Sequence, residues 1–280
     1  DVTTSERPFS SLLPLEDAED YRLQQSEKIK TNKLDALVNY FYVLNRTNHL
    51  NFTMGTTFVN QQFNSGLAQV NDGTSTPFDD ENLNNDVGFS FTDFYVGSRY
   101  KTKLGKFTLS PGLNMHFFRN KIEQLGTTAI LHKTLLLPDF FAKFEIRQAQ
   151  NITFNYGIKA EFPDIRNLAV GTILQSYNSL FEGNRTLENS WYHSFQLNYT
   201  NFNMFNFTNI YGGITYQKRY DNIVTGVNYA GLDRVSFPFN INAPNEVLSG
   251  YGNYQKRFTF MKIAADANWS YSKFFNEVDG

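Results

Sequence analysis

The sequence contains no cysteine, which excludes disulfide scaffolds, thiolate metal sites and cysteine nucleophiles. It also lacks an excess of basic residues, because 25 Lys and Arg stand against 27 Asp and Glu, a net charge of −2. We therefore expect no nucleic-acid partner and no polybasic attachment to an anionic membrane surface. No run of about 18 apolar residues is present, so a transmembrane α-helix is excluded.

Motifs for catalysis and metal binding are absent as well. The four histidines have no second His at metal-ligand spacing, and neither a Gly-x-Ser-x-Gly elbow nor a phosphate-binding loop occurs. The sequence therefore predicts a protein that is not an enzyme and that binds no metal or cofactor.

Aromatic residues, in contrast, are abundant at 16%, although the mean hydropathy is −0.43. They alternate with polar residues along most of the chain. In the segment 107–117 every odd position is apolar and every even position is small or polar. This period of two is typical of a β-strand whose two faces meet different environments.

The same alternation predicts ten long antiparallel strands. Their expected ranges are 34–44, 48–62, 88–101, 107–120, 134–148, 152–162, 189–200, 205–221, 248–256 and 258–273. The sequence before residue 34 has two interpretations. Its extended character allows the first strand to begin as early as Asp20, whereas an external loop over residues 1–33 would include one helical turn at 15–24.

Short and long predicted connections alternate along the chain. The tight turns are 45–47, 102–106, 149–151, 201–204 and 257, and the long polar loops are 63–87, 121–133, 163–188 and 222–247. A bacterial outer-membrane barrel sorts its connections in this way, with short periplasmic turns and long external loops. The apolar face of 107–117 spans about 33 Å at roughly 3.3 Å per residue, or about 25 Å when tilted, which matches the apolar belt of such barrels.

Register gives a second indication. A three-residue turn at 149–151 pairs residues whose numbers add up to 300, so Phe144 meets Tyr156 and Ala142 meets Ile158 on an apolar face. Charges at alternate positions cannot face hydrocarbon, where Lys or Arg costs about 2–4 kcal/mol at the midplane. The opposite face of these two strands therefore faces the lumen. Its charged row consists of Asp139, Lys143, Glu145, Arg147, Lys159 and Glu161.

Residues 162–189 contain a recognisable succession of motifs. They read Phe-Pro-Asp-Ile-Arg-Asn-Leu over 162–168, Tyr-Asn-Ser-Leu-Phe over 177–181 and Gly-Asn-Arg-Thr-Leu-Glu-Asn over 183–189. This pattern resembles the C-terminal barrel half of TonB-dependent outer-membrane receptors of the Bacteroidetes type. Arg185 and Asn189 stand where that family usually has proline, so subfamily and substrate cannot be carried over.

The resemblance implies that residues 1–280 are part of one barrel of about 22 strands, with a plug domain outside this chain. It implies active import of a scarce nutrient at the outer membrane. The implied partners are outer-membrane lipid, the protein's own N-terminal plug, an inner-membrane energy-coupling protein, a surface lipoprotein and a small-molecule, peptide or glycan ligand. The alternatives are a passive or secretion-associated outer-membrane barrel without energy coupling, and a soluble β-rich carbohydrate-binding module.

Two groups of functional residues are expected. Aromatic residues in the external loops have no lipid belt to join, so we expect them to contact ligand or to pack together as a lid; they are Tyr177, Phe181, Tyr229 and Phe237. The charged lumen row is neutral in sum, three positive and three negative, and so lacks a single-sign field for a charged solute. We expect this row to contact the plug.

Overall fold

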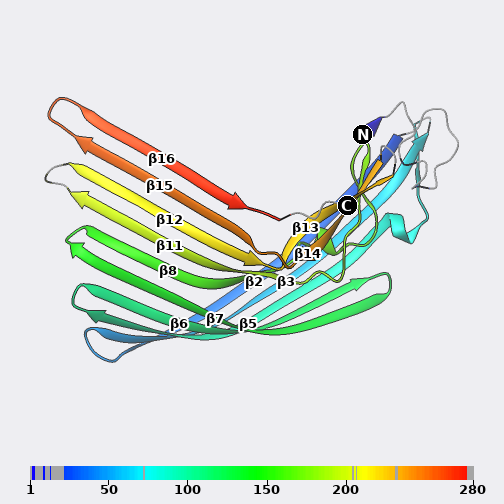
Figure 1. Cartoon of the computed structure of the whole chain (residues 1–280). Coiled ribbons are helices and arrows are strands. Elements are labelled where there is room, and N and C mark those ends of the chain that lie inside the picture. Colours follow the sequence, from blue (N-terminus) through cyan, green and yellow to red (C-terminus); the bar gives the residue numbers. More distant parts are fainter. Residues whose placement is uncertain are drawn as a thin grey trace.

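The computed structural model describes residues 2–3, 9, 13, 22–71, 73–203, 205, 207–230 and 233–275. Ten long strands form one antiparallel sheet in up-and-down order (Figure 1). They are β2 (Arg22–Val43), β3 (Asn48–Asn71), β5 (Asn84–Leu104), β6 (Phe107–Gln124), β7 (Thr127–Arg147), β8 (Gln150–Glu161), β11 (Ser190–Asn203), β12 (Thr208–Tyr220), β15 (Asn245–Arg257) and β16 (Lys262–Lys273). All ten predicted strands are thus confirmed.

Short elements complete the fold. They are β1 (Val2–Thr3), β4 (Thr74–Pro77), the 3₁₀ helix η1 (Glu81–Leu83), α1 (Ile165–Leu168), β9 (Ile173–Ser176), β10 (Ser179–Phe181), β13 (Asn222–Ala230) and β14 (Asp233–Ile241). A second sheet of four strands has the order β13-β14-β10-β9. Among the described residues, no helix has the length and apolar character needed to cross a membrane.

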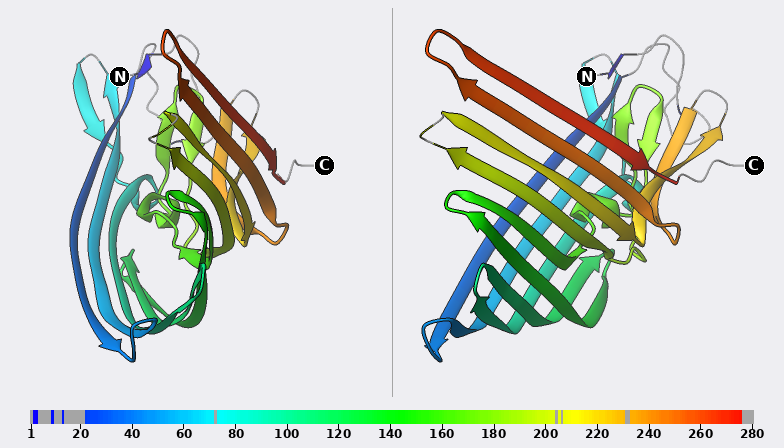
Figure 2. Two further views of the ribbon diagram at one scale, coloured as in Figure 1. Left: turned by 90° about the vertical axis from the view of Figure 1, so that its left-hand side faces the viewer. Right: turned by 60° about the vertical axis from the view of Figure 1, so that its left-hand side comes forward.

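The large sheet is curved like a trough, and five of its tight turns lie at one end (Figures 1 and 2). We call this end the turn end and the opposite one, where the longer connections and the β6–β7 hairpin turn lie, the loop end. Within the described residues β16 forms one edge of the large sheet, and β2 forms the other, where only the two residues of β1 pair with it. The four-stranded sheet and α1 lie at the loop end (Figure 1).

Several predicted loops are wrong, because strands continue into them. The predicted loop 121–133 is a hairpin with Leu125 and Gly126 at its tip, both at positive φ, as two-residue hairpin turns require. Most of the predicted loop 63–87 belongs to β3, β4, η1 and β5, and the loops 163–188 and 222–247 supply the small sheet. Because β2 begins at Arg22, the external-loop interpretation is wrong for residues 22–33, and so is the helical turn for 22–24; residues 15–21 lie outside the described residues.

The register between β7 and β8 also differs from the prediction. Phe140 pairs with Tyr156, Ala142 with Phe154 and Phe144 with Ile152, so the numbers add up to 296. The turn closes at Gln148 and Ala149, with Ala149 at φ 60°, and the register shifts once between Glu145 and Arg147. Up to Glu145 the shift is by four residues, an even number, which leaves each side chain on its predicted face. Beyond the register shift Arg147 pairs with Gln150, a shift by three, so Arg147 does not keep its predicted face.

Candidate ligand site on the concave face

The two faces of β5 and β6 exchange their polarity along the strands. Towards the turn end the outward face is apolar, as at Val96 and Leu113, whereas the concave face is polar. Beyond Phe94, which pairs with Phe117, the outward face becomes polar and the concave face apolar. Outward residues there include Arg119 and the ion-paired Lys121 and Glu123, and concave ones include Phe89, Phe91, Phe118 and Ile122. The apolar outward belt therefore ends near Phe94, although the strands continue.

Residues 163–188 fold into the trough and cover this apolar part of the concave face (Figure 2). Six of their side chains form one buried cluster with Phe63, Val87 and Phe89 of the wall: Ile165, Leu168, Ala169, Ile173, Phe181 and Leu187. Burial of this many apolar side chains holds the segment against the wall, because each contributes on the order of 1.5–3 kcal/mol when fully buried. We call residues 163–188 the docked segment.

A buried amide network fastens the docked segment to the wall. The side chain of Asn85 donates to the Ser65 hydroxyl and to the carbonyl of Gly171, both at 2.9 Å. Its own oxygen accepts from the Gly171 N–H at 2.8 Å and from the Gln124 side chain at 3.0 Å. The backbones approach so closely that a Cβ on Gly171 would lie 2.4 Å from the carbonyl oxygen of Asn84.

The motif at 183–189 closes the docked segment upon itself. Gly183 N–H donates to the Ala169 carbonyl at 2.8 Å, and a Cβ at Gly183 would lie 2.3 Å from that same oxygen. The Asn184 side chain accepts from the backbone and the hydroxyl of Thr186. A second buried cluster joins Leu180 of the docked segment to β2, β3 and residues 78–83; it consists of Phe9, Leu13, Leu23, Leu67, Phe78, Leu83 and Leu180.

An open pocket of about 570 Å³ lies between the docked segment and the two facing walls of the trough. Its apolar lining includes Phe89, Phe91 and Phe162, and the centroids of the last two rings are 4.6 Å apart. Arg219 from β12 and Glu161 from β8 also line it and form an ion pair of 2.5 Å. The lining combines this aromatic corner with eight polar or charged residues, and a concave site in which aromatic and polar groups converge is the candidate ligand site.

Asn222 and Ser190 are the most deeply buried polar residues of this lining, each with 3% of its surface exposed. The amide nitrogen of Asn222 donates to the carbonyls of Arg219 and Ala243 at 3.2 and 3.4 Å, which fixes the orientation of the amide. Its side-chain oxygen is buried and has no hydrogen-bond partner.

The predicted loop aromatics separate into two pairs. Tyr177 and Tyr229 are 59% and 75% exposed, so their rings are available at the surface. Phe181 is only 7% exposed and belongs to the cluster beneath the docked segment, while Phe237 is partly buried and packs against Phe239 at 5.9 Å. None of the four lines the 570 Å³ pocket. A ligand role for them stays a prediction.

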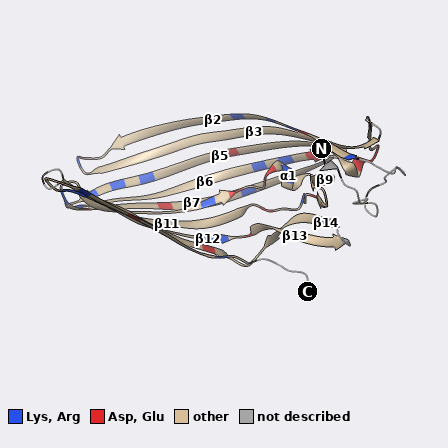
Figure 3. Cartoon of the chain, turned by 90° about the horizontal axis from the view of Figure 1, so that it is seen from above, with Lys and Arg blue, Asp and Glu red and all other residues tan. Residues whose placement is uncertain are grey.

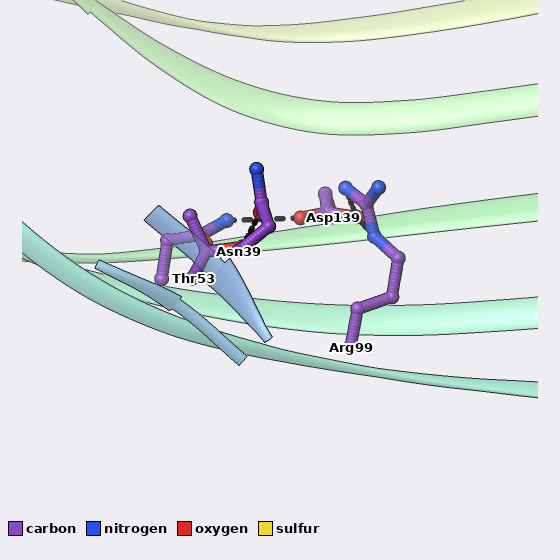
Figure 4. Close-up of polar contacts among 5 residues, drawn as sticks. Asn39, Thr53, Arg99 and Asp139 are labelled. Atoms are coloured by element: carbon purple, nitrogen blue, oxygen red, sulfur yellow. Dashed lines mark hydrogen bonds and ion pairs between the residues drawn. The ribbon is translucent and has the colours of Figure 1, made fainter. Parts of the chain in front are cut away.

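Five members of the charged lumen row keep their predicted face, whereas Arg147 lies beyond the register shift and pairs with Gln150. The acidic members of the row pair mainly outside it. Asp139 binds Arg99 at 2.7 Å and accepts from Asn114 at 2.9 Å, and Gly112 between the two strands leaves room for this contact. Figure 4 shows Arg99 and Asp139 pointing toward each other, near the hydrogen bond of 2.8 Å between Thr53 and Asn39.

The remaining members of the row lie nearer the two ends. Lys143 binds Glu145 at 2.9 Å, and Lys103 of β5 approaches the same carboxylate at 3.7 Å. Glu161 binds Arg219 in the candidate pocket, and Lys159 lines a smaller pocket with Asp139. Arg147 is the last residue of β7, at the turn end. Contact of this row with a plug stays a prediction.

The two ends of the sheet carry opposite charge. Around the five tight turns, residues 43–49, 101–108, 143–151, 202–209 and 255–263 include nine Lys and Arg and one Glu, a net charge of +8. At the loop end, residues 73–93, 121–133, 161–190 and 219–246 include six Lys and Arg and thirteen Asp and Glu, a net charge of −7. Figure 3 shows Lys and Arg bands on the strands near the turn end. The overall charge of −2 conceals this separation.

Sequence reasoning missed the pocket residues Phe89, Phe91, Arg219 and Asn222. A signal for the first two was present, because alternation continues past Phe94 with the apolar residues on the other face. No comparable signal marks Arg219 or Asn222, whose roles arise from contacts between distant segments. In the part of the chain that the structure describes, no group of three or more His, Asp or Glu is placed to hold a metal ion.

An up-and-down antiparallel sheet with an apolar outward belt and a partly filled concave face defines a transmembrane β-barrel protein of the outer membrane. The chain belongs to the outer membrane protein beta-barrel family, whose model matches residues 6–279. No curated protein matches the chain. The localisation predicted from the sequence is thereby confirmed.

Several solved structures share this fold. The copper transporter OprC has a TM-score of 0.66 and 9% identity, over 89% of this chain and 40% of its own. The Serratia marcescens hemophore receptor HasR was solved as a double mutant with its hemophore HasA and heme. It has a TM-score of 0.64 and 11% identity, and the match covers 92% of this chain and 46% of HasR. The ferric citrate transporter FecA has a TM-score of 0.60 and 9% identity, and the match covers 92% of this chain and 37% of FecA. The chain thus spans less than half the length of these proteins, and the barrels it resembles are those of TonB-dependent receptors.

Proposed function

We propose that this protein imports a scarce nutrient across the outer membrane by binding it at the loop end and moving it through a plugged barrel. The observation that carries the proposal is the docked segment, which is held on the concave wall by a nine-residue apolar cluster. A wall covered in this way leaves an open pocket beside the docked segment and narrows the lumen, which favours a binding site over a wide aqueous pore. The similarity to a copper transporter and a ferric citrate transporter supports the same function.

The sheet edges support a larger barrel. β2, with 22 residues, and β16, with 12 residues, are the two edge strands of the large sheet. Among the described residues, the outer backbone N–H and C=O groups of both strands have no strand partner over most of their length. Unpaired backbone groups cost several kcal/mol each in hydrocarbon, so membrane barrels close completely. Further strands therefore complete the barrel, to about 22 as in plugged outer-membrane transporters. We place a plug in its lumen and an energy-coupling protein of the inner membrane at its periplasmic side.

The Bacteroidetes-type relationship rests on the motifs at 162–189, which here build the docked segment. A surface lipoprotein at the loop end belongs to the same proposal. Transport and receptor names among the similar structures support a protein that is not an enzyme.

Active import and a passive barrel differ in two measurable properties, the channel conductance in a bilayer and the dependence of uptake on the proton-motive force. We expect the full-length protein in planar bilayers to show no stable open channel, and its uptake of nutrient in cells to stop when a protonophore collapses the proton-motive force. Stable ohmic channels together with uptake that is insensitive to the protonophore would contradict active import and establish the passive barrel.

A further inference from the structure

We propose that the outward face of the large sheet binds a phosphorylated glycolipid, directly beyond the apolar belt at the loop end. The surface is formed by the outward side chains of four neighbouring strand segments, namely 28–34 of β2, 58–64 of β3, 86–92 of β5 and 119–123 of β6. We call it the headgroup face. With the loop end outside, its lipid neighbours are those of the outer leaflet. It is separate from the candidate pocket and does not depend on the imported nutrient.

The headgroup face continues the apolar belt along the same strands. Arg119 lies two residues beyond Phe117 on β6, which is about 7 Å along the strand. Lys30 lies four residues beyond Leu34 on β2, which is about 13 Å. These even spacings keep each cation on the same side of the sheet as the apolar residue. Phe117 and Leu34 are 40% and 63% exposed, so the lipids whose acyl chains cover them bring their headgroups to these cations.

Three cations of the headgroup face have no acidic partner in the described part of the chain. They are Lys28, Lys30 and Arg119, and all three are exposed. Lys and Arg donate charge-assisted hydrogen bonds to phosphate, and the planar guanidinium of Arg can donate two in parallel. These three side chains are therefore free to bind the phosphate groups of a lipid.

The two carboxylates of the headgroup face are already engaged. Glu123 forms an ion pair with Lys121, and Asp86 accepts a hydrogen bond from the Asn64 side chain at 2.8 Å. With four cations and two carboxylates the headgroup face has a net charge of +2, whereas the loop end as a whole carries −7. The cations thus lie beside the membrane, where they attract anionic headgroups.

Amide side chains lie between the cations of β2 and those of β6. Lys30 pairs with Gln62 of β3, while Arg119 lies on β6, which is three strand spacings or about 14 Å from β2. An open hollow of about 910 Å³ lies in this region. Its lining includes Asn60, Gln62 and Gly88, and Gly88 has no side chain to fill it.

The hollow also has carboxylates in its lining, those of Glu81, Asp86 and Glu123. Carboxylate and amide oxygens accept hydrogen bonds from hydroxyl groups, whereas carboxylates repel phosphate. A ligand that fits both parts of the face therefore carries hydroxyl groups in its middle and phosphate groups towards its ends. A phosphorylated sugar headgroup has this chemistry, and its acyl chains pack on the apolar belt.

The test is lipid binding to the full-length protein in detergent, measured by native mass spectrometry after copurified lipid has been removed. Four probes are compared: lipid A as a phosphorylated disaccharide lipid, its dephosphorylated form, phosphatidylglycerol and inorganic phosphate. We expect lipid A to bind most tightly and the other three to bind at least about tenfold more weakly. Equal binding of dephosphorylated lipid A or of phosphatidylglycerol, displacement of lipid A by millimolar phosphate, or no binding of lipid A would each overturn the inference.

A triple variant locates the site. Lys28→Gln, Lys30→Gln and Arg119→Gln together remove the three cations without an acidic partner. Each Lys or Arg near a charged membrane surface contributes about fivefold to affinity, so binding of lipid A should weaken on the order of a hundredfold. All three side chains are exposed, and we expect the variant to give the same amount of heat-modifiable, folded barrel as the wild type.

The control is a second triple variant with the same change of charge. Lys101→Gln, Arg257→Gln and Lys262→Gln remove three exposed cations from the concave face near the turn end. We expect its affinity for lipid A to stay within about twofold of the wild type. Equal loss in the two triple variants would mean that the lipid responds only to overall charge, and would overturn the inference.

Discussion

Phenylalanine rings beside the tight turns lie open, whereas those in the cluster beneath the docked segment are buried. Phe205 and Phe260 beside the tight turns are 99% and 84% exposed, but Phe63 and Phe181 in the cluster are 0% and 7% exposed. The charge differs as well, at +8 around the turns and −7 at the loop end. The comparison teaches that the same alternating strand pattern can build two different concave surfaces. The concave face is polar near the turns and apolar, covered by the docked segment, near the loops.

The transition between the two regions lies near Phe94 and Phe117. On the side of the turn end the outward face is apolar, and on the side of the loop end the concave face packs against the docked segment. Four predictions below test the difference between these regions, in order of decreasing effect.

Removal of a ring beneath the docked segment should have the largest effect. Phe181→Ala deletes a side chain that is 7% exposed, and such core truncations cost about 3–5 kcal/mol. We expect faster proteolysis within residues 163–188, measured on folded protein in detergent. The control is Tyr177→Ala, four residues away and 59% exposed, which should leave the cleavage rate unchanged. Equal cleavage of both variants would show that the segment is not docked.

A charge in the outward belt should disturb membrane assembly. Leu113→Arg places a cation on the lipid face at a cost of about 2–4 kcal/mol, so the amount of heat-modifiable, folded barrel should fall. Asn114→Arg is adjacent but faces the concave side near Asp139, and should be much better tolerated. The belt assignment fails if the two variants assemble equally well.

A methyl group at the close contact of the docked segment should loosen it. Gly183→Ala forces a Cβ to within 2.3 Å of the Ala169 carbonyl oxygen, and overpacking of this kind costs about 1–3 kcal/mol. We expect lower thermal stability of the folded protein. Gly252→Ala on β15 is the control, since nothing lies within 4 Å of its added Cβ. A wild-type melting temperature for Gly183→Ala would mean that the segment can move aside.

Charge reversal in the lumen row should have the smallest effect on stability. Exposed ion pairs contribute about 0–1 kcal/mol, so Lys143→Glu with Arg147→Glu should still fold. We expect the doubly reversed barrel to become leaky to large antibiotics, because the row loses its contact with the plug. If the barrel stays sealed and only ligand affinity falls, the row belongs to the substrate path.

Most of the strand framework was predictable, because alternation is a local property. The segment 107–117 identifies a strand and its lipid face without any tertiary information. Even the register error between β7 and β8 preserved the faces up to Glu145, since it was a shift by four there, and only Arg147 beyond the register shift departs from its predicted face. The loop-end parts of β5 and β6 were missed, because their apolar residues lie on the concave face beyond Phe94 and Phe117. The predicted strands had been defined by apolar residues on the outward face.

The candidate site was not predictable in the same way. Asn85 and Gly171 are 86 residues apart, and their hydrogen bonds decide where the docked segment lies. The pocket draws Phe91, Glu161 and Asn222 from three separate parts of the chain. No periodicity connects such residues. For the loops, local sequence therefore offered only aromatic residues as ligand candidates, namely Tyr177 and Tyr229, which are exposed, and Phe181 and Phe237, which are packed.

Sidedness can be measured most directly by labelling single cysteines on intact cells with a membrane-impermeant maleimide, which is free of background from this chain because it has no cysteine. Ser75→Cys lies in β4 at the loop end and Lys103→Cys lies in β5 near the turn end, and both positions are exposed. If the loop end faces the exterior, Ser75→Cys is labelled on intact cells and Lys103→Cys only after lysis. Labelling of Lys103→Cys on intact cells, with Ser75→Cys protected, would contradict the proposed orientation.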